Sequence, residues 1–267
     1  MLTPDLQRIL QQRPLGLVFD IDGTISPIAP TPEEARLYPG MAELLQRARD
    51  CQGVKVGIIT GRTVQSGAAM VNVEGLTYIG THGLEWSDGL PSSSQIQLVP
   101  EALRYAEPGK QLLDLVEQKL TDIPGLRIER KQVGGAIHFR LSPDPQEALQ
   151  RVSQLLTEPA RQLNMRLEEG KMMVEVRAPR EVAIDKGKAL RRFVQRKDLQ
   201  GVIFAGDDLT DLDAIKEVAS LRKEGIAACS IAVKHADTPS NVLKQADITV
   251  EEVAGLAALL REILAAL

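Results

Sequence analysis

The sequence LGLVFDIDGT (residues 15–24) joins an unbroken apolar run to two carboxylates and a glycine turn. An apolar run of this kind is typical of a strand that is buried on both faces of a parallel sheet. Comparable runs occur at 54–60 (VKVGIIT) and 201–208 (GVIFAGDD), and a helical pattern follows each of them. Strands that alternate with helices predict an α/β fold with a doubly wound, Rossmann-like parallel sheet at its core.

The segment 106–182 departs from this alternation, because a helical pattern is followed there by two strand-like runs and the set then repeats (αββαββ). Alternation along these strands predicts an apolar face against the helices and a polar face on the other side. The apolar set comprises Ile137, Phe139, Leu141, Met172, Val174 and Val176. The polar set comprises His138, Arg140, Lys171, Glu175 and Arg177. We therefore predict a core formed by residues 1–105 and 183–267 and an inserted α/β cap domain at 106–182.

The composition is that of a globular protein rather than a disordered chain, with 43% apolar and 25% charged residues. The 267 residues include 36 acidic and 32 basic side chains, so the basic excess of a nucleic-acid binder is missing. No apolar run is long enough to span a membrane, and the first residues are too polar for a signal peptide. Cys51 and Cys229 lie in apolar stretches, which indicates reduced thiols. We expect a cytoplasmic monomer without a nucleic-acid or membrane partner.

Polar clusters follow the predicted strands at the carboxyl edge, where an open α/β sheet binds its ligands. Asp20 and Asp22 can share one site, and the turn at Gly23 and Thr24 offers backbone N–H groups to an anion. An ordinary acidic turn at the end of a strand would have the same sequence. Thr60-Gly61-Arg62 opens a predicted helix, which suits either an anion site or a simple helix cap.

The clearest chemical signal is the sequence GDDLTD (residues 206–211). Its three carboxylates, Asp207, Asp208 and Asp211, repel one another unless a cation lies among them. Oxygen ligands without a neighbouring histidine or cysteine favour Mg²⁺ over zinc. Lys186 also stands at the start of a predicted helix, where the helix dipole disfavours a cation unless an anion is close.

In this order and spacing, the clusters resemble the motifs of the haloacid dehalogenase superfamily of phosphotransferases, and the insert looks like the type IIB cap of that superfamily. Within it, the chain is most similar to the trehalose-6-phosphate phosphatase family. The matching strings are DIDGTI, IITGR, GTHGLEW, ERK followed by HFR, GKMMVEVR, DKGKAL and GDDLTD. The chain departs from the family pattern at Thr81 (usually Asn), Phe139 (usually Tyr), Ala178 (usually Pro) and Leu212 (usually Glu).

The resemblance implies hydrolysis of a sugar phosphate, most of all trehalose 6-phosphate, through an aspartyl-phosphate intermediate. It assigns Asp20 as the nucleophile and Asp22 as the acid and base, with Thr60 and Lys186 on the phosphate. A carboxylate and one phosphate charge about 4 Å apart repel by about 4 kcal/mol at an effective dielectric constant near 20, so the reaction needs cations. The expected Mg²⁺ ligands are Asp20, the backbone carbonyl of Asp22, Asp207, Asp208 and Asp211.

The polar face of the predicted cap would bind the sugar part of the substrate. The candidate substrate-binding residues there are Glu129, Lys131, His138, Arg140, Lys171 and Glu175. The alternative is a solvated face with cross-strand ion pairs. Gly61, Arg62 and His82 are expected to line the same cleft from the core, whereas Trp86 is expected to pack in the interior and His235 to lie on the surface.

Other functions share parts of this pattern. Other sugar phosphates, such as sucrose phosphate or a mannosyl- or glucosyl-phosphoglycerate, would suit the same catalytic core. A response-regulator receiver also combines an acidic pair, a threonine and a lysine, but its phospho-acceptor lies on a different strand from the pair and it has no cap. A catalytically silent module that binds sugar phosphates would not need Asp20 and Asp22 together.

Overall fold

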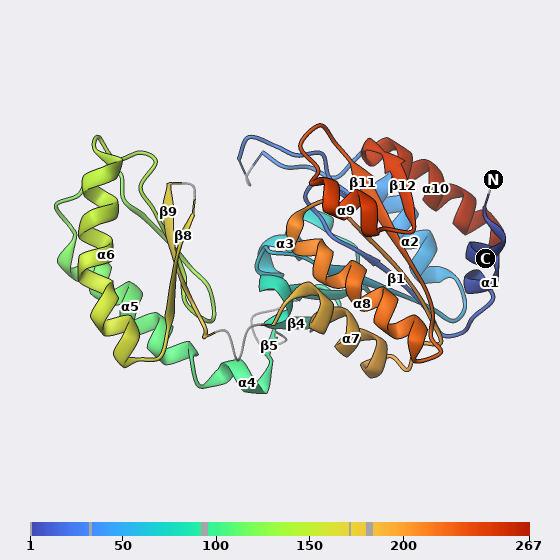
Figure 1. The fold of residues 1–267 in the computed structure, drawn as a ribbon, viewed down its shortest axis with the longest axis horizontal. Coiled ribbons are helices and arrows are strands. Elements are labelled where there is room, and N and C mark those ends of the chain that lie inside the picture. The colour runs from blue at the N-terminus through green and yellow to red at the C-terminus, as the bar shows by residue number, and fades with distance from the viewer. Residues whose placement is uncertain (1, 32–33, 92–95, 171, 180–183) are drawn as a thin grey trace. The chain divides into compact units, whose positions relative to one another are not determined.

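The computed structural model describes residues 2–31, 34–91, 96–170, 172–179 and 184–267 (Figure 1). The chain forms two compact units, one made of residues 1–97 and 184–267 and the other of residues 98–183. The second unit thus starts before residue 106, the boundary that the sequence suggested. The second unit includes α4 (Pro100–Leu103), and just after it the Tyr105 hydroxyl accepts a hydrogen bond from the Asn164 side-chain amide (3.4 Å).

The first unit is built on an eight-stranded sheet in which β1 (Leu15–Phe19) lies between β10 and β2. The strand order is β12 (Ile248–Glu251), β11 (Ala227–Lys234), β10 (Gly201–Gly206), β1, β2 (Val54–Ile59), β3 (Thr77–Gly80), β4 (Glu85–Asp88) and β5 (Gln97–Leu98). The strands from β12 to β3 are parallel, and β4 runs antiparallel to β3. This arrangement confirms the predicted α/β fold with a mostly parallel sheet.

Helices cover both faces of this sheet. One apolar core contains alternate residues of β1, among them Leu15, Leu17 and Phe19, together with the buried sides of four helices. These helices are α1 (Pro4–Leu10), α2 (Met41–Asp50), α3 (Val64–Val71) and α10 (Glu252–Ala266). The helices α7 (Lys186–Arg196), α8 (Leu212–Lys223) and α9 (Ser240–Gln245) follow one another outside this core (Figure 1).

The position of α7 is set by a close contact with the sheet. The ring of Phe193 is fully buried and lies against Gly16 and Gly57, which point to the face opposite the core just described. A Cβ atom at Gly57 would lie 3.1 Å from Phe193 Cζ, so glycine lets the ring sit directly on the strand. The helix begins at Lys186 because the Asp185 carboxylate accepts a hydrogen bond from the N–H of Lys188 (2.7 Å).

The second unit has the order that the sequence predicted, with two helices on one face of a four-stranded antiparallel sheet (Figure 1). Its strands are β6 (Arg127–Arg130), β7 (Gly135–His138), β9 (Met173–Arg177) and β8 (Arg166–Gly170), and its long helices are α5 (Ala106–Lys119) and α6 (Pro145–Gln162). Ile137, Val174 and Val176 are buried against these helices as expected, and Phe139 is buried beyond the end of β7.

Two residues of the predicted apolar face are exposed instead. Leu141 is 59% exposed because β7 ends at His138 and the chain has already left the sheet. Met172 is 43% exposed because it lies in the turn between β8 and β9 with φ +61°. The alternation of buried and exposed residues along a strand thus predicts burial correctly only for residues that lie within the strand. No helix among the described residues is long and apolar enough to cross a membrane.

We expect Phe193→Ala to lower the free energy of unfolding by about 3–5 kcal/mol, because the ring fills the space between α7 and the two strand glycines. Chemical denaturation followed by circular dichroism would measure the loss. Ile28→Ala is the matched control, since Ile28 is 56% exposed and its truncation should change stability by no more than about 0.5 kcal/mol. Equal effects of the two substitutions would contradict this account of the α7 contact.

Candidate active site

A buried ion pair joins the end of β1 to the start of α7. Asp20 directly follows β1, and its Oδ1 atom lies 2.9 Å from Nζ of Lys186. The same Nζ atom lies 2.7 Å from Oδ1 of Asp211, and all three side chains are almost inaccessible to solvent. Burial by itself lowers the pKa of Lys186, but the carboxylates of Asp20 and Asp211 more than reverse this and raise it above its ordinary value. Lys186 is therefore an ammonium ion.

Asp207 completes a cluster of three buried carboxylates, because one oxygen each of Asp20, Asp207 and Asp211 lie within 4.8 Å of one another. Asp207 accepts a hydrogen bond from the Thr24 hydroxyl (3.0 Å). Gly23 has φ +81°, and a Cβ atom there would lie 2.1 Å from Oδ2 of Asp207, so only glycine allows the two segments to approach. Burial, followed by repulsion from neighbouring carboxylates, raises the pKa of Asp207 to about 7.

The charges of this cluster do not balance. Burial and the neighbouring carboxylates also raise the pKa values of Asp20 and Asp211, although Lys186 opposes both shifts. One ammonium group cannot neutralise three carboxylates, and each carboxylate is buried. A set of oxygen donors with excess negative charge fits a hard divalent cation such as Mg²⁺. The donor set therefore agrees with the metal that the sequence predicted.

Asp208, which the sequence placed among the metal ligands, has another use in the structure. Its side chain caps the short 3-10 helix η3 (Leu209–Asp211) and accepts hydrogen bonds from the N–H groups of Thr210 (2.8 Å) and Asp211 (3.3 Å). Asp211 in turn accepts hydrogen bonds from the N–H groups of Asp207 and Asp208. One of the three acids thus holds the loop that carries the other two.

Arg62 is the partner of Asp22. The guanidinium donates to both carboxylate oxygens of Asp22, from Nε to Oδ2 (2.7 Å) and from Nη2 to Oδ1 (2.7 Å). A bidentate pair of this kind restricts the orientation of the carboxylate. Thr60 is buried directly after β2 and accepts a hydrogen bond from the N–H of Arg62 (3.2 Å). The structure thus pairs Arg62 with Asp22, and the expectation that Arg62 binds substrate stays a prediction.

The segment after β3 packs against this turn in an unusual backbone conformation. Thr81 and His82 both have positive φ angles, +49° and +56°, and their N–H groups donate to the carbonyl oxygens of Arg62 and Thr60. The His82 ring lies on Gly61, where a Cβ atom would come within 2.8 Å of Cε1. A left-handed conformation is easier for asparagine than for threonine, so the departure from the family pattern at Thr81 falls on a strained position.

Three further side chains of the first unit have defined hydrogen-bond partners. Trp86 is buried, as expected, and donates to the Gly83 carbonyl (2.9 Å). Glu85 was not singled out, yet it is buried and accepts a hydrogen bond from the first N–H of α3 at Val64 (2.8 Å). The prediction that His235 lies on the surface is wrong, because its side chain is only 9% exposed and packs beside the Asp20–Thr24 turn.

Four of the candidate sugar-binding residues of the second unit pair across its sheet. Lys131 lies 3.1 Å from Glu175, and His138 lies 3.1 Å from Glu129. Arg140 is exposed beyond the end of β7, and Lys171 lies outside the described residues. Lys131 and Glu175 are the more enclosed pair, with 15% and 20% of their side chains exposed.

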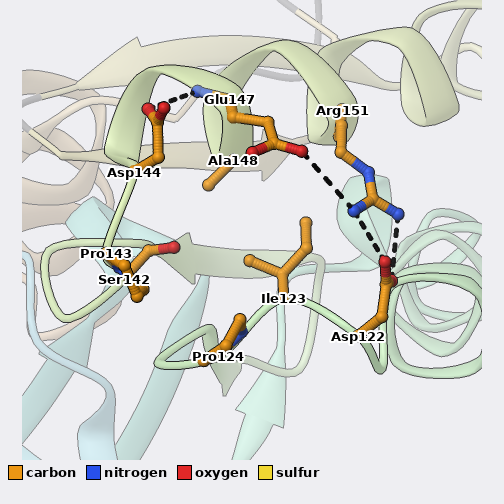
Figure 2. A pocket seen from close by; sticks show the side chains of 9 residues that line it. All are labelled: Asp122, Ile123, Pro124, Ser142, Pro143, Asp144, Glu147, Ala148 and Arg151. Carbon is orange, nitrogen blue, oxygen red and sulfur yellow. Dashed lines mark hydrogen bonds and ion pairs between the residues drawn. The ribbon is translucent and has the colours of Figure 1, made fainter.

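A separate small pocket lies at the start of α6, and Figure 2 shows that its charged side chains are already paired. Arg151 donates to both oxygens of Asp122, and Asp144 accepts hydrogen bonds from the N–H groups of Gln146 and Glu147. The pocket lining comprises Asp122, Ile123, Pro124, Ser142, Pro143, Asp144, Glu147, Ala148 and Arg151. None of the predicted sugar-binding residues belongs to it.

Comparison with known proteins identifies the family of the chain. The model of the trehalose-phosphatase family matches residues 18–252, a range that contains every residue of the carboxylate cluster. The chain belongs to the trehalose-phosphatase family. An uncharacterized glycosyl hydrolase of Mycobacterium tuberculosis is 33% identical over 222 residues, which cover 80% of this chain and 16% of that protein. The trehalose-phosphate phosphatase of Mycobacterium leprae is 30% identical over 249 residues, 88% of this chain and 53% of that protein.

This member of the trehalose-phosphatase family thus spans about half, or less, of the length of the curated relatives it matches. Solved structures show the same fold over nearly the whole chain. A trehalose-6-phosphate phosphatase related protein has a TM-score of 0.70 at 24% identity, with 94% of this chain and 97% of that one covered. The C-terminal domain of the Candida albicans trehalose-6-phosphate phosphatase has a TM-score of 0.71 at 20% identity, with 98% and 96% covered.

We expect Mg²⁺ to raise the melting temperature of this trehalose-phosphatase family member more at about pH 8 than at about pH 6. The pKa of Asp207 is raised from 3.8 to about 7. Unless a cation binds, the folded state therefore loses stability as the pH rises from 3.8 to about 7. Below about pH 7, protons compete with the cation for the same carboxylate. At a concentration 100 times its Kd, the ion would add about 2.7 kcal/mol, or about 5 °C or more.

Differential scanning fluorimetry with and without Mg²⁺ would test this expectation, with Asp207→Asn as the control that removes one ligand and should reduce the shift. Equal shifts at the two pH values would mean that the titration of Asp207 does not govern binding. No shift at either pH would argue against a cation at the cluster.

Proposed function

We propose that the chain is a magnesium-dependent phosphomonoesterase that hydrolyses trehalose 6-phosphate to trehalose and phosphate. The observation that carries this proposal is the Lys186 ammonium group, which is shared between Asp20 and Asp211 beside Asp207. A carboxylate held against a buried cation can approach a phosphate dianion that would otherwise repel it. Membership of the trehalose-phosphatase family supports the choice of substrate.

In the first half of the reaction, Asp20 acts as the nucleophile. An oxygen of its carboxylate forms a bond to phosphorus while the bond from phosphorus to the sugar oxygen breaks. The leaving oxygen takes a proton from the carboxyl group of Asp22 and departs as the sugar hydroxyl. In the structure Arg62 pairs with both oxygens of Asp22 (2.7 Å each), which favours the ionised carboxylate, so Asp22 must leave this pair to carry the proton that it donates.

In the second half, water releases the phosphate from Asp20. The Asp22 carboxylate takes a proton from the attacking water as its oxygen bonds to phosphorus, and the bond between phosphorus and Asp20 breaks. The products are inorganic phosphate and the regenerated Asp20 carboxylate, and Asp22 has recovered the proton that it gave away. Each half-reaction thus uses the same two carboxylates in complementary roles.

Cationic and polar groups around Asp20 would hold the phosphate. Lys186 neutralises charge on the transferred group, and the Thr60 hydroxyl binds one of its oxygens. Mg²⁺, held by Asp20, Asp207 and the Asp22 carbonyl with Asp211 in support, would supply further positive charge. Both protein groups are buried, which strengthens their interaction with a charged ligand.

The sugar would be recognised by the second unit. Lys131 and Glu175 are the strongest candidates because they form a pair that is largely enclosed. A sugar hydroxyl can hydrogen-bond to either charged group and take the place of the other member of the pair. The remaining candidates are Glu129, His138, Arg140 and Lys171. We also propose a cytoplasmic location, since Cys51 and Cys229 are both free thiols.

The test of the reaction is the release of phosphate from trehalose 6-phosphate in the presence of Mg²⁺, with other sugar phosphates assayed alongside. Asp20→Asn should abolish turnover because it removes the nucleophile. Asp22→Asn should lose turnover of the sugar phosphate but keep part of the activity on an aryl phosphate, whose leaving group needs little protonation. Wild-type rates in Asp20→Asn would exclude the covalent mechanism, and preference for another sugar phosphate would exclude trehalose 6-phosphate as the substrate.

Recognition of the sugar predicts a selective effect of Glu175→Ala. Loss of charge-assisted hydrogen bonds should lower kcat/KM for trehalose 6-phosphate by about 10- to 150-fold, whereas an aryl phosphate should be hydrolysed nearly as before. Glu168→Ala is the matched control, because Glu168 belongs to the same sheet and is also paired, with Arg166 on its own strand (2.6 Å) and with Arg177 on β9 (2.7 Å). Equal losses on both substrates would assign Glu175 to the stability of the sheet.

A further inference from the structure

His235 lies at the carboxyl edge of the core sheet, directly after β11. Its Nε2 atom is 2.5 Å from the carbonyl oxygen of Gly23, and its Nδ1 atom is 2.6 Å from Oε2 of Glu252. The His235 side chain is 9% exposed, so these two contacts, rather than water, satisfy most of its hydrogen-bonding capacity. The contact with Gly23 joins segments that are far apart in the sequence.

The geometry determines the protonation of the ring. A carbonyl oxygen can only accept a hydrogen bond, so Nε2 must carry a hydrogen, and the contact of Nδ1 with Oε2 of Glu252 calls for a second hydrogen on Nδ1 when Glu252 is a carboxylate. The ring is then an imidazolium ion. Burial lowers the pKa of His235, but the Gly23 carbonyl and Glu252 outweigh this effect, with Asp207 contributing, and the pKa is raised.

The backbone at Glu252 is a second, independent observation. Glu252 is the first residue of α10 and has φ +56°, a left-handed conformation that non-glycine residues rarely adopt. Strained backbone of this kind is retained where the surrounding structure uses it. Here the conformation accompanies a carboxylate that reaches the ring of His235.

The Gly23 carbonyl belongs to the turn that carries the acid and base of the proposed reaction. The neighbouring Asp22 is paired with Arg62, and the hydroxyl of Thr24 donates to Asp207. The N–H of Gly23 donates to the Ser26 carbonyl (2.8 Å). His235 is therefore attached to the peptide group that joins Gly23 to Thr24, between two residues whose side chains both enter the site.

We propose that His235 is a positioning residue for the turn that contains Asp22. Its ring, oriented by Glu252, holds the carbonyl oxygen of Gly23 and thereby fixes the direction of the Gly23–Thr24 peptide, one residue after Asp22. This inference rests on the proposed function, because its effect on rate appears only if the turn acts in phosphoryl transfer. The state of the ring itself can be observed without any reaction.

The first experiment measures the ring in the whole chain with bound Mg²⁺. Long-range ¹H–¹⁵N NMR of the imidazole should show both ring nitrogens of His235 protonated at neutral pH, and Glu252→Gln should lose this signature. Glu251→Gln is the matched control. Glu251 is the last residue of β12 and pairs with Lys234, the last residue of β11 (2.8 Å), so the pair lies at the ends of these strands, one residue before Glu252 and His235. A neutral ring in the unsubstituted protein would overturn the proposal.

The second experiment measures turnover. His235→Ala should lower kcat by about 10- to 100-fold on both the sugar phosphate and an aryl phosphate with little change in KM, because a charge-assisted hydrogen bond is lost at the turn and not at the substrate. His235→Gln, which keeps a side-chain N–H donor, should recover part of the loss, and Glu251→Gln should keep the wild-type kcat. Melting temperatures would show which variants are folded, and Glu252→Gln gives a smaller perturbation if His235→Ala does not fold.

These outcomes separate the two proposals. If the unsubstituted chain hydrolyses no phosphomonoester but His235 is doubly protonated, the proposed function fails and the contact stands. If the chain is active and folded His235→Ala retains the wild-type kcat, the positioning role is wrong and the proposed function stands. Equal losses in His235→Ala and His235→Gln would also overturn the role of the Nε2–H donor.

Discussion

The buried ammonium group of Lys186 is the constraint on which the carboxyl edge of the core sheet depends. A lysine with almost no solvent exposure is tolerable only when carboxylates compensate its charge, and removing one partner of such a pair is strongly destabilising. Asp20 supplies one partner from the end of β1, and Asp211 supplies the other from the loop after β10. Three segments that are distant in the sequence must therefore meet at one nitrogen atom.

The Asp20–Thr24 turn at the carboxyl edge of the core sheet is held by contacts with residues from several other strands. Arg62 binds the Asp22 carboxylate from the end of β2, while His235 binds the Gly23 carbonyl from the end of β11. Thr24 is tied to Asp207 beyond β10. Because these contacts come from different strands of one parallel sheet, the register of the sheet also sets the geometry of the turn. Little freedom remains for the backbone around Asp22.

Much of this arrangement follows from local patterns. The apolar runs around Val18 and Ile58 predict the parallel sheet correctly because strands buried on both faces need no alternation. Asp20, Lys186 and Asp207 lie together because each directly follows a strand or opens a helix at the same edge. The partners of Arg62 and His235 are not predictable in this way, since they depend on side-chain conformations and on contacts between distant segments. Short elements such as α9, β4 and β12 have too few residues for a recognisable period.

The placement of α7 has a further consequence for how this sequence can change. Lys186 and Phe193 are separated by about two helical turns, so both side chains project from the same side of the helix. One end of that side is seated on the glycines of the sheet, and the other carries the charge that enters the carboxylate cluster. An inserted or deleted residue between them would rotate one against the other by about 100°. The number of residues between Lys186 and Phe193 is therefore fixed by the structure. Within α7, insertions or deletions are compatible with this site only after Phe193.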